Sequence, residues 1–133
     1  MIHSEVSEQT MADYAVKAMR YAYSPYTGFC VGATVLSVEY QVLHTGANVE
    51  AGSSACGMCA ERIAIAKCLM ANQIPAAIAI ASIGGLSCCG ICRQFMLDFP
   101  EMKVYIVDSE TNKIIQKTTP RKMLPSGYQR VKK

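Results

Sequence analysis

The chain has 133 residues, of which 51% are hydrophobic and 17% are charged, and its formal net charge is +3. This composition is typical of a folded globular protein and excludes a disordered chain, and the length fits one domain over residues 1–133. Apart from a tail at 130–133, Lys and Arg are scattered along the chain rather than clustered, which argues against a nucleic-acid partner.

The N-terminal residues have neither the basic region nor the apolar region of a signal peptide. No run of the chain approaches the ~18 apolar residues that span a bilayer, so we expect a cytoplasmic protein with no membrane partner. Seven cysteines in such a chain indicate reduced thiols or metal ligands more than disulfides, and their odd number supports this interpretation.

The first half of the chain is expected to contain one helix and two strands. Apolar residues at helical spacing predict an amphipathic helix over residues 7–22. A turn-rich stretch follows, and a strand is expected over 29–36 because small or apolar residues occupy both of its faces. A second strand over 40–46 is expected to return beside it, although residues 38–41 lack the Gly or Asn that is typical of hairpin turns.

The second half is expected to alternate helices with buried strands. Helix formers predict a second helix over 59–70, and an apolar run predicts a strand over 76–81. The remaining expected elements are a loop at 84–85, a short helix at 90–99, a strand at 103–107 and a last strand near 114–115. Strands that are apolar on both faces and alternate with helices predict a three-layer α/β fold with a mixed, mostly five-stranded sheet.

Two Cys-x-x-Cys pairs, Cys56 with Cys59 and Cys89 with Cys92, point to metal chemistry. Four cysteines in two such pairs are typical of a closed structural zinc site, which leaves no position for water. However, 29 residues separate Cys59 from Cys89, whereas compact sites of this kind have roughly 15 to 20 residues between their pairs. A third interpretation is that a Cys-x-x-Cys pair is redox-active. The presence of two pairs with an acidic residue nearby does not favour this interpretation.

That acidic residue is Glu61, which lies two positions after Cys59. A ligand-x-Glu segment followed by Cys-x-x-Cys in a later element is the arrangement of zinc deaminases, in which the Glu does not bind the metal. Cys59, Cys89 and Cys92 would then hold Zn²⁺ as the cofactor and leave its fourth position open for water. Cys59 is expected to begin one helix, and Cys89 and Cys92 to lie on one face of the next.

Position 88 departs from the deaminase pattern, which has Pro there. Cys88 could therefore compete with Cys89 as a ligand, but only Cys89 has the Cys-x-x-Cys spacing to Cys92. We expect Cys56 and Cys88 to be non-ligands.

Four stretches of the chain resemble the cytidine deaminase family, and they lie at 23–33, 48–50, 59–62 and 87–94. The resemblance runs from about Tyr21 to Tyr128. It implies a three-layer α/β/α cytidine deaminase-like fold and a homotetramer whose active sites lie near subunit contacts. It also implies that Arg62 offsets thiolate charge in the second shell of the metal. The residues that it implies for substrate binding are Phe29, Asn48, Val49, Glu50 and Ala60.

Asn48 and Glu50 also have a physical interpretation of their own. An amide together with a carboxylate can satisfy the donors and acceptors of a pair of sugar hydroxyl groups. From the residues alone, a turn role for Asn48 and a solvated loop charge for Glu50 stay open as alternatives. The resemblance favours contact with the ribose, with Phe29 packed on the base.

The predicted reaction is hydrolytic deamination of cytidine and deoxycytidine to uridine and deoxyuridine plus ammonia, in pyrimidine salvage. A zinc-bound hydroxide would attack C4, and Glu61 would pass a proton to N3 and then help to protonate the departing amine. A nucleic-acid substrate is not favoured, because the chain has no basic groove signature.

Two alternatives remain open. One is an enzyme similar to blasticidin S deaminase, because residues 124–128 resemble that relative and Ser54 stands where the family usually has Tyr. The other is a non-enzymatic protein with a four-cysteine structural zinc.

Overall fold

The computed structural model describes residues 6–39 and 41–133, which form a five-stranded sheet in the order β2-β1-β3-β4-β5. The strands are β1 (Gly32–Ser37), β2 (Leu43–Ala47), β3 (Pro75–Ser82), β4 (Lys103–Asp108) and β5 (Lys113–Thr118). β1 is antiparallel to both β2 and β3, β3 is parallel to β4, and β5 is antiparallel to β4. The expected α/β fold with a mixed five-stranded sheet is confirmed.

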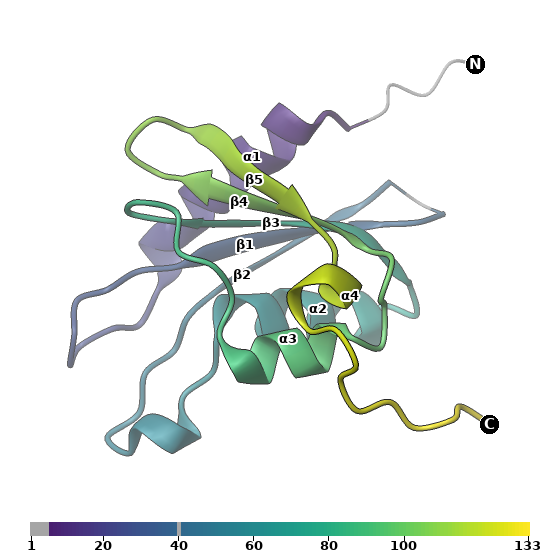
Figure 1. Cartoon of the computed structure of the whole chain (residues 1–133). Coiled ribbons are helices and arrows are strands. Elements are labelled where there is room, and N and C mark those ends of the chain that lie inside the picture. Colours follow the sequence, from purple (N-terminus) through teal and green to yellow (C-terminus); the bar gives the residue numbers. More distant parts are fainter. Residues whose placement is uncertain (1–5, 40) are drawn as a thin grey trace.

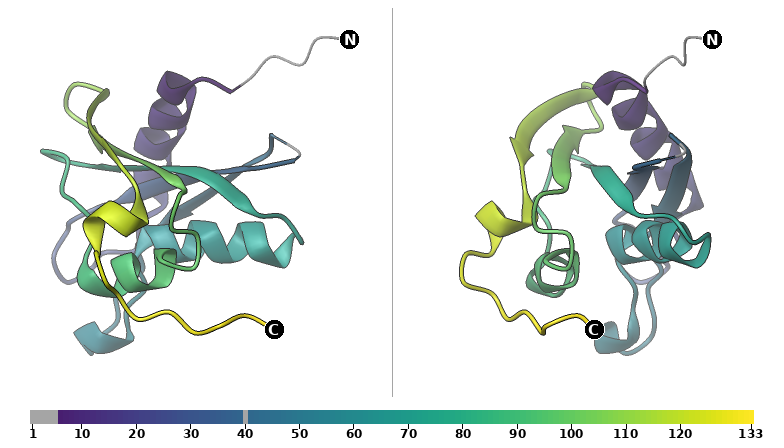
Figure 2. Two further views of the ribbon diagram at one scale, coloured as in Figure 1. Left: turned by 45° about the vertical axis from the view of Figure 1, so that its right-hand side comes forward. Right: turned by 90° about the vertical axis from the view of Figure 1, so that its right-hand side faces the viewer.

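Helices cover both faces of this sheet (Figures 1 and 2). The helices are α1 (Glu8–Ala18), α2 (Ala60–Met70), α3 (Gly90–Met96) and α4 (Pro120–Met123), with the 3₁₀ helices η1 (Met19–Tyr21) and η2 (Ser54–Cys56). α1 packs on one face over a core that includes Met11, and α2 and α3 pack on the other over a core that includes Ile65. Every residue of β1 is buried because both faces are covered.

The first strand begins three residues later than expected, at Gly32 rather than at Phe29. The Asn48 side chain explains the difference. Its Oδ1 accepts the Val31 N–H (2.8 Å), and its Nδ2 donates to the Phe29 carbonyl (2.9 Å). Because these main-chain groups bond to the Asn48 side chain and not to a neighbouring strand, residues 29–31 lie outside β1 and are available to line a pocket.

The expected hairpin between β1 and β2 is present, although β2 begins at Leu43 and Tyr40 lies outside the described residues. Gln41 has φ 51°, so it supplies the left-handed conformation that Gly or Asn usually provides in such a turn. The Ser37 N–H donates to the Val42 carbonyl (3.0 Å), which closes the turn.

Helix ends and short helices differ most from the expectation. α1 gives way to η1 at Met19 instead of continuing to Ala22, and α3 ends at Met96 instead of Phe99. α4 was not expected, although Thr119 caps it and Pro120 occupies its first position, a common start signal. Within residues 6–39 and 41–133, no helix is long and apolar enough to cross a membrane.

Two glycines set how closely the helices approach the sheet. A Cβ atom on Gly32 would lie 2.0 Å from the Ala15 carbonyl oxygen of α1, and one on Gly46 would lie 2.6 Å from the Ala60 carbonyl oxygen of α2. These contacts leave no room for a side chain. The first turn of α2 therefore rests directly on the backbone of β2.

Candidate metal centre and substrate pocket

Three cysteine thiols meet at the N-terminal ends of two helices. Cys59 is the N-cap of α2, Cys89 is the N-cap of α3, and Cys92 lies in the first turn of α3. Their Sγ atoms lie within 4.8 Å of one another, and those of Cys59 and Cys89 are 3.7 Å apart. Tetrahedral zinc with Zn–S bonds of about 2.3 Å separates its sulfurs by roughly 3.8 Å, so this three-thiol cluster fits Zn²⁺. Three ligands leave one position open.

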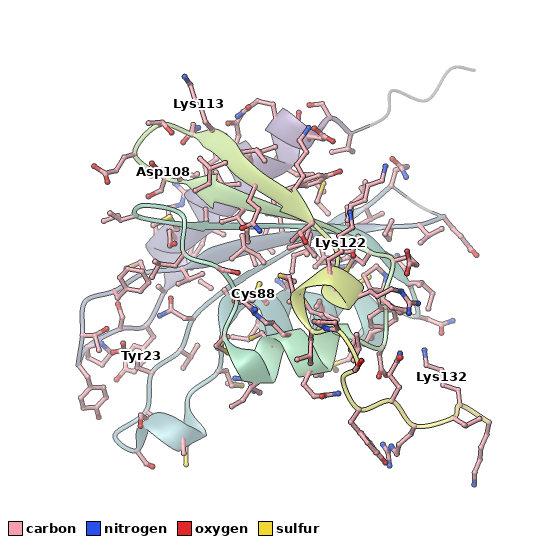
Figure 3. The ribbon with its side chains drawn as sticks, in the orientation of Figure 1. Tyr23, Cys88, Asp108, Lys113, Lys122 and Lys132 are labelled. Atoms are coloured by element: carbon pink, nitrogen blue, oxygen red, sulfur yellow. The ribbon has the colours of Figure 1, made fainter. Side chains whose placement is uncertain are left out.

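The other two cysteines considered as ligands, Cys56 and Cys88, do not belong to this cluster. Among the described residues, the group of side chains that can hold a metal consists of Cys59, Cys89 and Cys92. Cys56 is exposed at the end of η2, and Cys88 is buried on the segment that leads from the sheet into α3 (Figure 3). The structure therefore brings together both cysteines of the pair Cys89 and Cys92 but only Cys59 of the other pair.

The protein environment favours the thiolate of Cys89, whereas burial raises the pKa of Cys92. The Cys92 N–H donates to Cys89 Sγ (3.5 Å) in the first turn of α3. Burial by itself would raise the pKa of Cys89, but hydrogen bonds from Cys92 and Cys59 outweigh it and bring the pKa below its usual value. A lowered pKa prepares this sulfur for metal binding.

Arg62 lies against the same sulfurs. Its Nη2 donates to Cys59 Sγ (3.5 Å), and this hydrogen bond raises the pKa of the guanidinium above its already high value. Three thiolates and one Zn²⁺ carry a net negative charge, which the fixed positive charge of Arg62 offsets. The sequence predicts Arg62 in this place.

Glu61 is the second residue of α2, and its side chain is 4% exposed. Burial raises the pKa of this carboxyl, and a hydrogen bond from its own backbone N–H and the charge of Arg62 oppose the rise only in part. The carboxyl is not among the metal-holding group and lines the same pocket as Cys59 and Cys89. A buried carboxyl with a raised pKa beside an open metal position is suited to proton transfer.

A pocket of about 460 Å³ opens in front of the thiols and Glu61. Two loops form much of its wall: the first pocket loop (22–31) leads into β1, and the second pocket loop (48–59) connects β2 to α2. The predicted substrate residues all line this pocket, and they are Phe29, Asn48, Val49, Glu50 and Ala60. Ser54 lines it as well.

Glu50 is hydrogen-bonded to the first pocket loop and is only partly buried. Its Oε1 accepts the N–H groups of Tyr26 (2.9 Å) and Thr27 (3.1 Å), and its Oε2 accepts the Thr27 hydroxyl. These hydrogen bonds, above all that from the Thr27 hydroxyl, hold the pKa of Glu50 below its usual value. From the sequence, no role is predicted for Thr27. Its hydroxyl, within the stretch 23–33, is the feature that could have indicated one.

Comparisons with known proteins agree with this geometry. Residues 5–108 match the family model of the cytidine and deoxycytidylate deaminase zinc-binding region. The chain is similar to the cytidine deaminase of Sporosarcina psychrophila, with 34% identity over 117 residues and 84% of each chain covered. It is 32% identical over 129 residues to that of Halalkalibacterium halodurans, covering 92% of this chain and 95% of the relative.

Solved structures show the same fold. A cytidine deaminase from Burkholderia pseudomallei matches with a TM-score of 0.84 and 30% identity, covering 92% of this chain and 99% of its own. A cytidine deaminase from Mycobacterium tuberculosis matches with a TM-score of 0.79 and 26% identity, covering 93% and 98%.

We expect Cys59→Ala to lose bound zinc and Cys56→Ala to keep about one zinc ion per chain, because Cys59 alone of the two belongs to the three-thiol cluster. Elemental analysis of the purified variants measures the metal, and circular dichroism checks that both are folded. Loss of zinc and of folded structure in Cys56→Ala would instead support a closed four-thiolate site.

Proposed function

The chain belongs to the family of zinc-binding cytidine and deoxycytidylate deaminases and is a zinc-dependent enzyme of that family, and we propose that it hydrolyses cytidine and deoxycytidine to uridine and deoxyuridine with release of ammonia. In this proposal residues 1–133 form one deaminase domain, which serves pyrimidine salvage in the cytoplasm. The observation that carries the proposal is Glu61, which is buried beside the three-thiol cluster in a pocket lined by the expected nucleoside-binding residues.

The proposed chemistry divides between the metal ligands and Glu61. Cys59, Cys89 and Cys92 would hold Zn²⁺, whose Lewis acidity would make water nucleophilic near neutral pH. Glu61 accepts a proton from the attacking water and transfers it to N3 of the base. It then takes the proton of the new hydroxyl group on C4 and delivers it to the amine, so that the C4–N bond breaks as the carbonyl forms and ammonia leaves. Because burial raises the pKa of Glu61, one carboxyl can act as base and then as acid.

Sugar recognition is proposed to rest on Asn48 and Glu50, with Phe29 packed on the base. A carboxylate offers about four acceptor positions, and Tyr26 and Thr27 already occupy three of those on Glu50. One position remains, which suffices for a single sugar hydroxyl. Ribose and deoxyribose both supply such a group, so this geometry supports acceptance of both nucleosides.

A parallel ultraviolet assay of the zinc-loaded protein with cytidine, deoxycytidine, cytosine and blasticidin S tests the substrate. We expect kcat/KM for the two nucleosides to agree within about tenfold, since at most one neutral hydrogen bond distinguishes them. Cytosine should react more slowly because it lacks the sugar. Preference for blasticidin S would favour the antibiotic-directed alternative, and no turnover of any compound would favour the structural-zinc alternative.

The role of Glu61 predicts the behaviour of Glu61→Gln. This variant keeps the shape of the side chain but cannot move a proton, so we expect kcat to fall by about 10²- to 10⁴-fold while zinc content stays unchanged. Glu101→Gln is a matched control, because Glu101 is exposed and does not line the pocket. Activity of Glu61→Gln within tenfold of the wild type would remove Glu61 from the reaction.

We also propose a homotetramer, supported by exposed apolar side chains that line the pocket mouth, which are Tyr26, Phe29, Met58, Leu86 and Ile91. Exposed apolar side chains gathered at one place mark protein contacts or ligand-binding grooves, and we assign those at the mouth to a subunit contact. Light scattering after gel filtration should give about four times the 14.4 kDa of one chain. Ile91→Glu should lower that mass by placing a charge in the contact. A wild-type monomer at micromolar concentration would contradict the proposal.

A further inference from the structure

The first pocket loop is hydrogen-bonded to residues 48–50 of the second. Tyr23 of the first loop, which is labelled in Figure 3, pairs with Val49 of the second in a parallel bridge. The Tyr23 N–H donates to the Asn48 carbonyl (2.8 Å), and the Glu50 N–H donates to the Tyr23 carbonyl (2.8 Å). This pairing brings the turn at 24–28 against the Glu50 carboxylate.

The Thr27 hydroxyl lies between Glu50 and Phe29, and its hydrogen bonds have one possible direction. An ionised carboxylate only accepts hydrogen bonds, and a backbone N–H only donates them. Thr27 Oγ1 therefore donates to Glu50 Oε2 and accepts from the Phe29 N–H (3.0 Å). One hydroxyl connects the side chain expected at the sugar with the residue expected at the base.

Phe29 depends on such support because its side chain is 37% exposed and is not fixed by a core around it. Its backbone is held on both sides, at the N–H by Thr27 and at the carbonyl by the Asn48 amide (2.9 Å). Removing the hydroxyl frees one side of Phe29 and one oxygen of Glu50 at the same time.

We propose that Thr27 is a positioning residue for nucleoside binding, whose hydroxyl couples Glu50 to Phe29 so that the sugar-binding and base-packing groups are set together. The inference rests on the proposed function. Among the described residues, the side-chain hydrogen bonds of Thr27 go to Glu50 and Phe29. The three-thiol cluster and Glu61 instead belong to α2 and α3 and their N-caps. Its effect is therefore on substrate binding and not on proton transfer.

Thr27→Val tests this inference, because valine keeps the branched shape and the backbone N–H but lacks the hydroxyl. We expect KM for deoxycytidine to rise roughly 10- to 100-fold, the range for a lost hydrogen bond to a charged group, while kcat stays within about threefold. Zinc content should match the wild type, and the melting temperature should fall only by the small amount that one lost hydrogen bond explains. Thr27→Ser retains the hydroxyl and should restore KM.

A double-mutant cycle with Glu50→Gln separates positioning from a purely structural role. If Thr27 acts through Glu50, Thr27→Val should raise KM much less in the Glu50→Gln background than in the wild type. Additive effects, an unchanged KM, or an equal loss of kcat and zinc would each overturn the inference. Thr27→Ala gives the same comparison if the valine variant does not fold. Absence of wild-type turnover contradicts the proposed function, whereas turnover with a normal KM in Thr27→Val contradicts only the role of Thr27.

Discussion

The meeting of three cysteine sulfurs at one point, which the proposed zinc site requires, organises this protein. Their Sγ atoms lie within 4.8 Å of one another, and as thiolates they repel unless positive charge compensates them. The helix N-termini and Arg62 supply part of that charge. The topology places the sulfurs. α2 directly precedes β3 and runs antiparallel to it, and α3 directly follows β3, so both helices begin at the carboxyl end of that strand.

The substrate pocket adds a second layer that depends on hydrogen bonds rather than on buried apolar contacts. The pocket loops carry exposed aromatic side chains, so little of their order comes from a hydrophobic core. Asn48 and Glu50 hold the first loop through its backbone while they line the pocket. In the proposed enzyme, the groups that bind the nucleoside also keep the pocket wall in place.

Local spacing explains what could be predicted from the sequence. Two residue pairs each lie within a single helical turn, Cys59 with Glu61 and Cys89 with Cys92, so their spacing in the sequence indicates that their side chains lie close together. The alternation of strands with helices along the chain indicates the sheet. The missed features depend on distant partners or on backbone conformation. Asn48 shortens β1 from 17 residues away, and Glu50 meets Thr27 across 23 residues. Turn-residue rules do not anticipate a left-handed Gln41.

The contact between Gly46 and the Ala60 carbonyl has an evolutionary consequence. The start of α2 approaches the backbone of β2 at this contact, so the height of Cys59 and Glu61 above the sheet depends on position 46 having no side chain. The second pocket loop begins two residues after Gly46, at Asn48. In the proposed enzyme, changes in the sequence of this loop can therefore alter the pocket wall while Cys59 and Glu61 keep their mutual geometry.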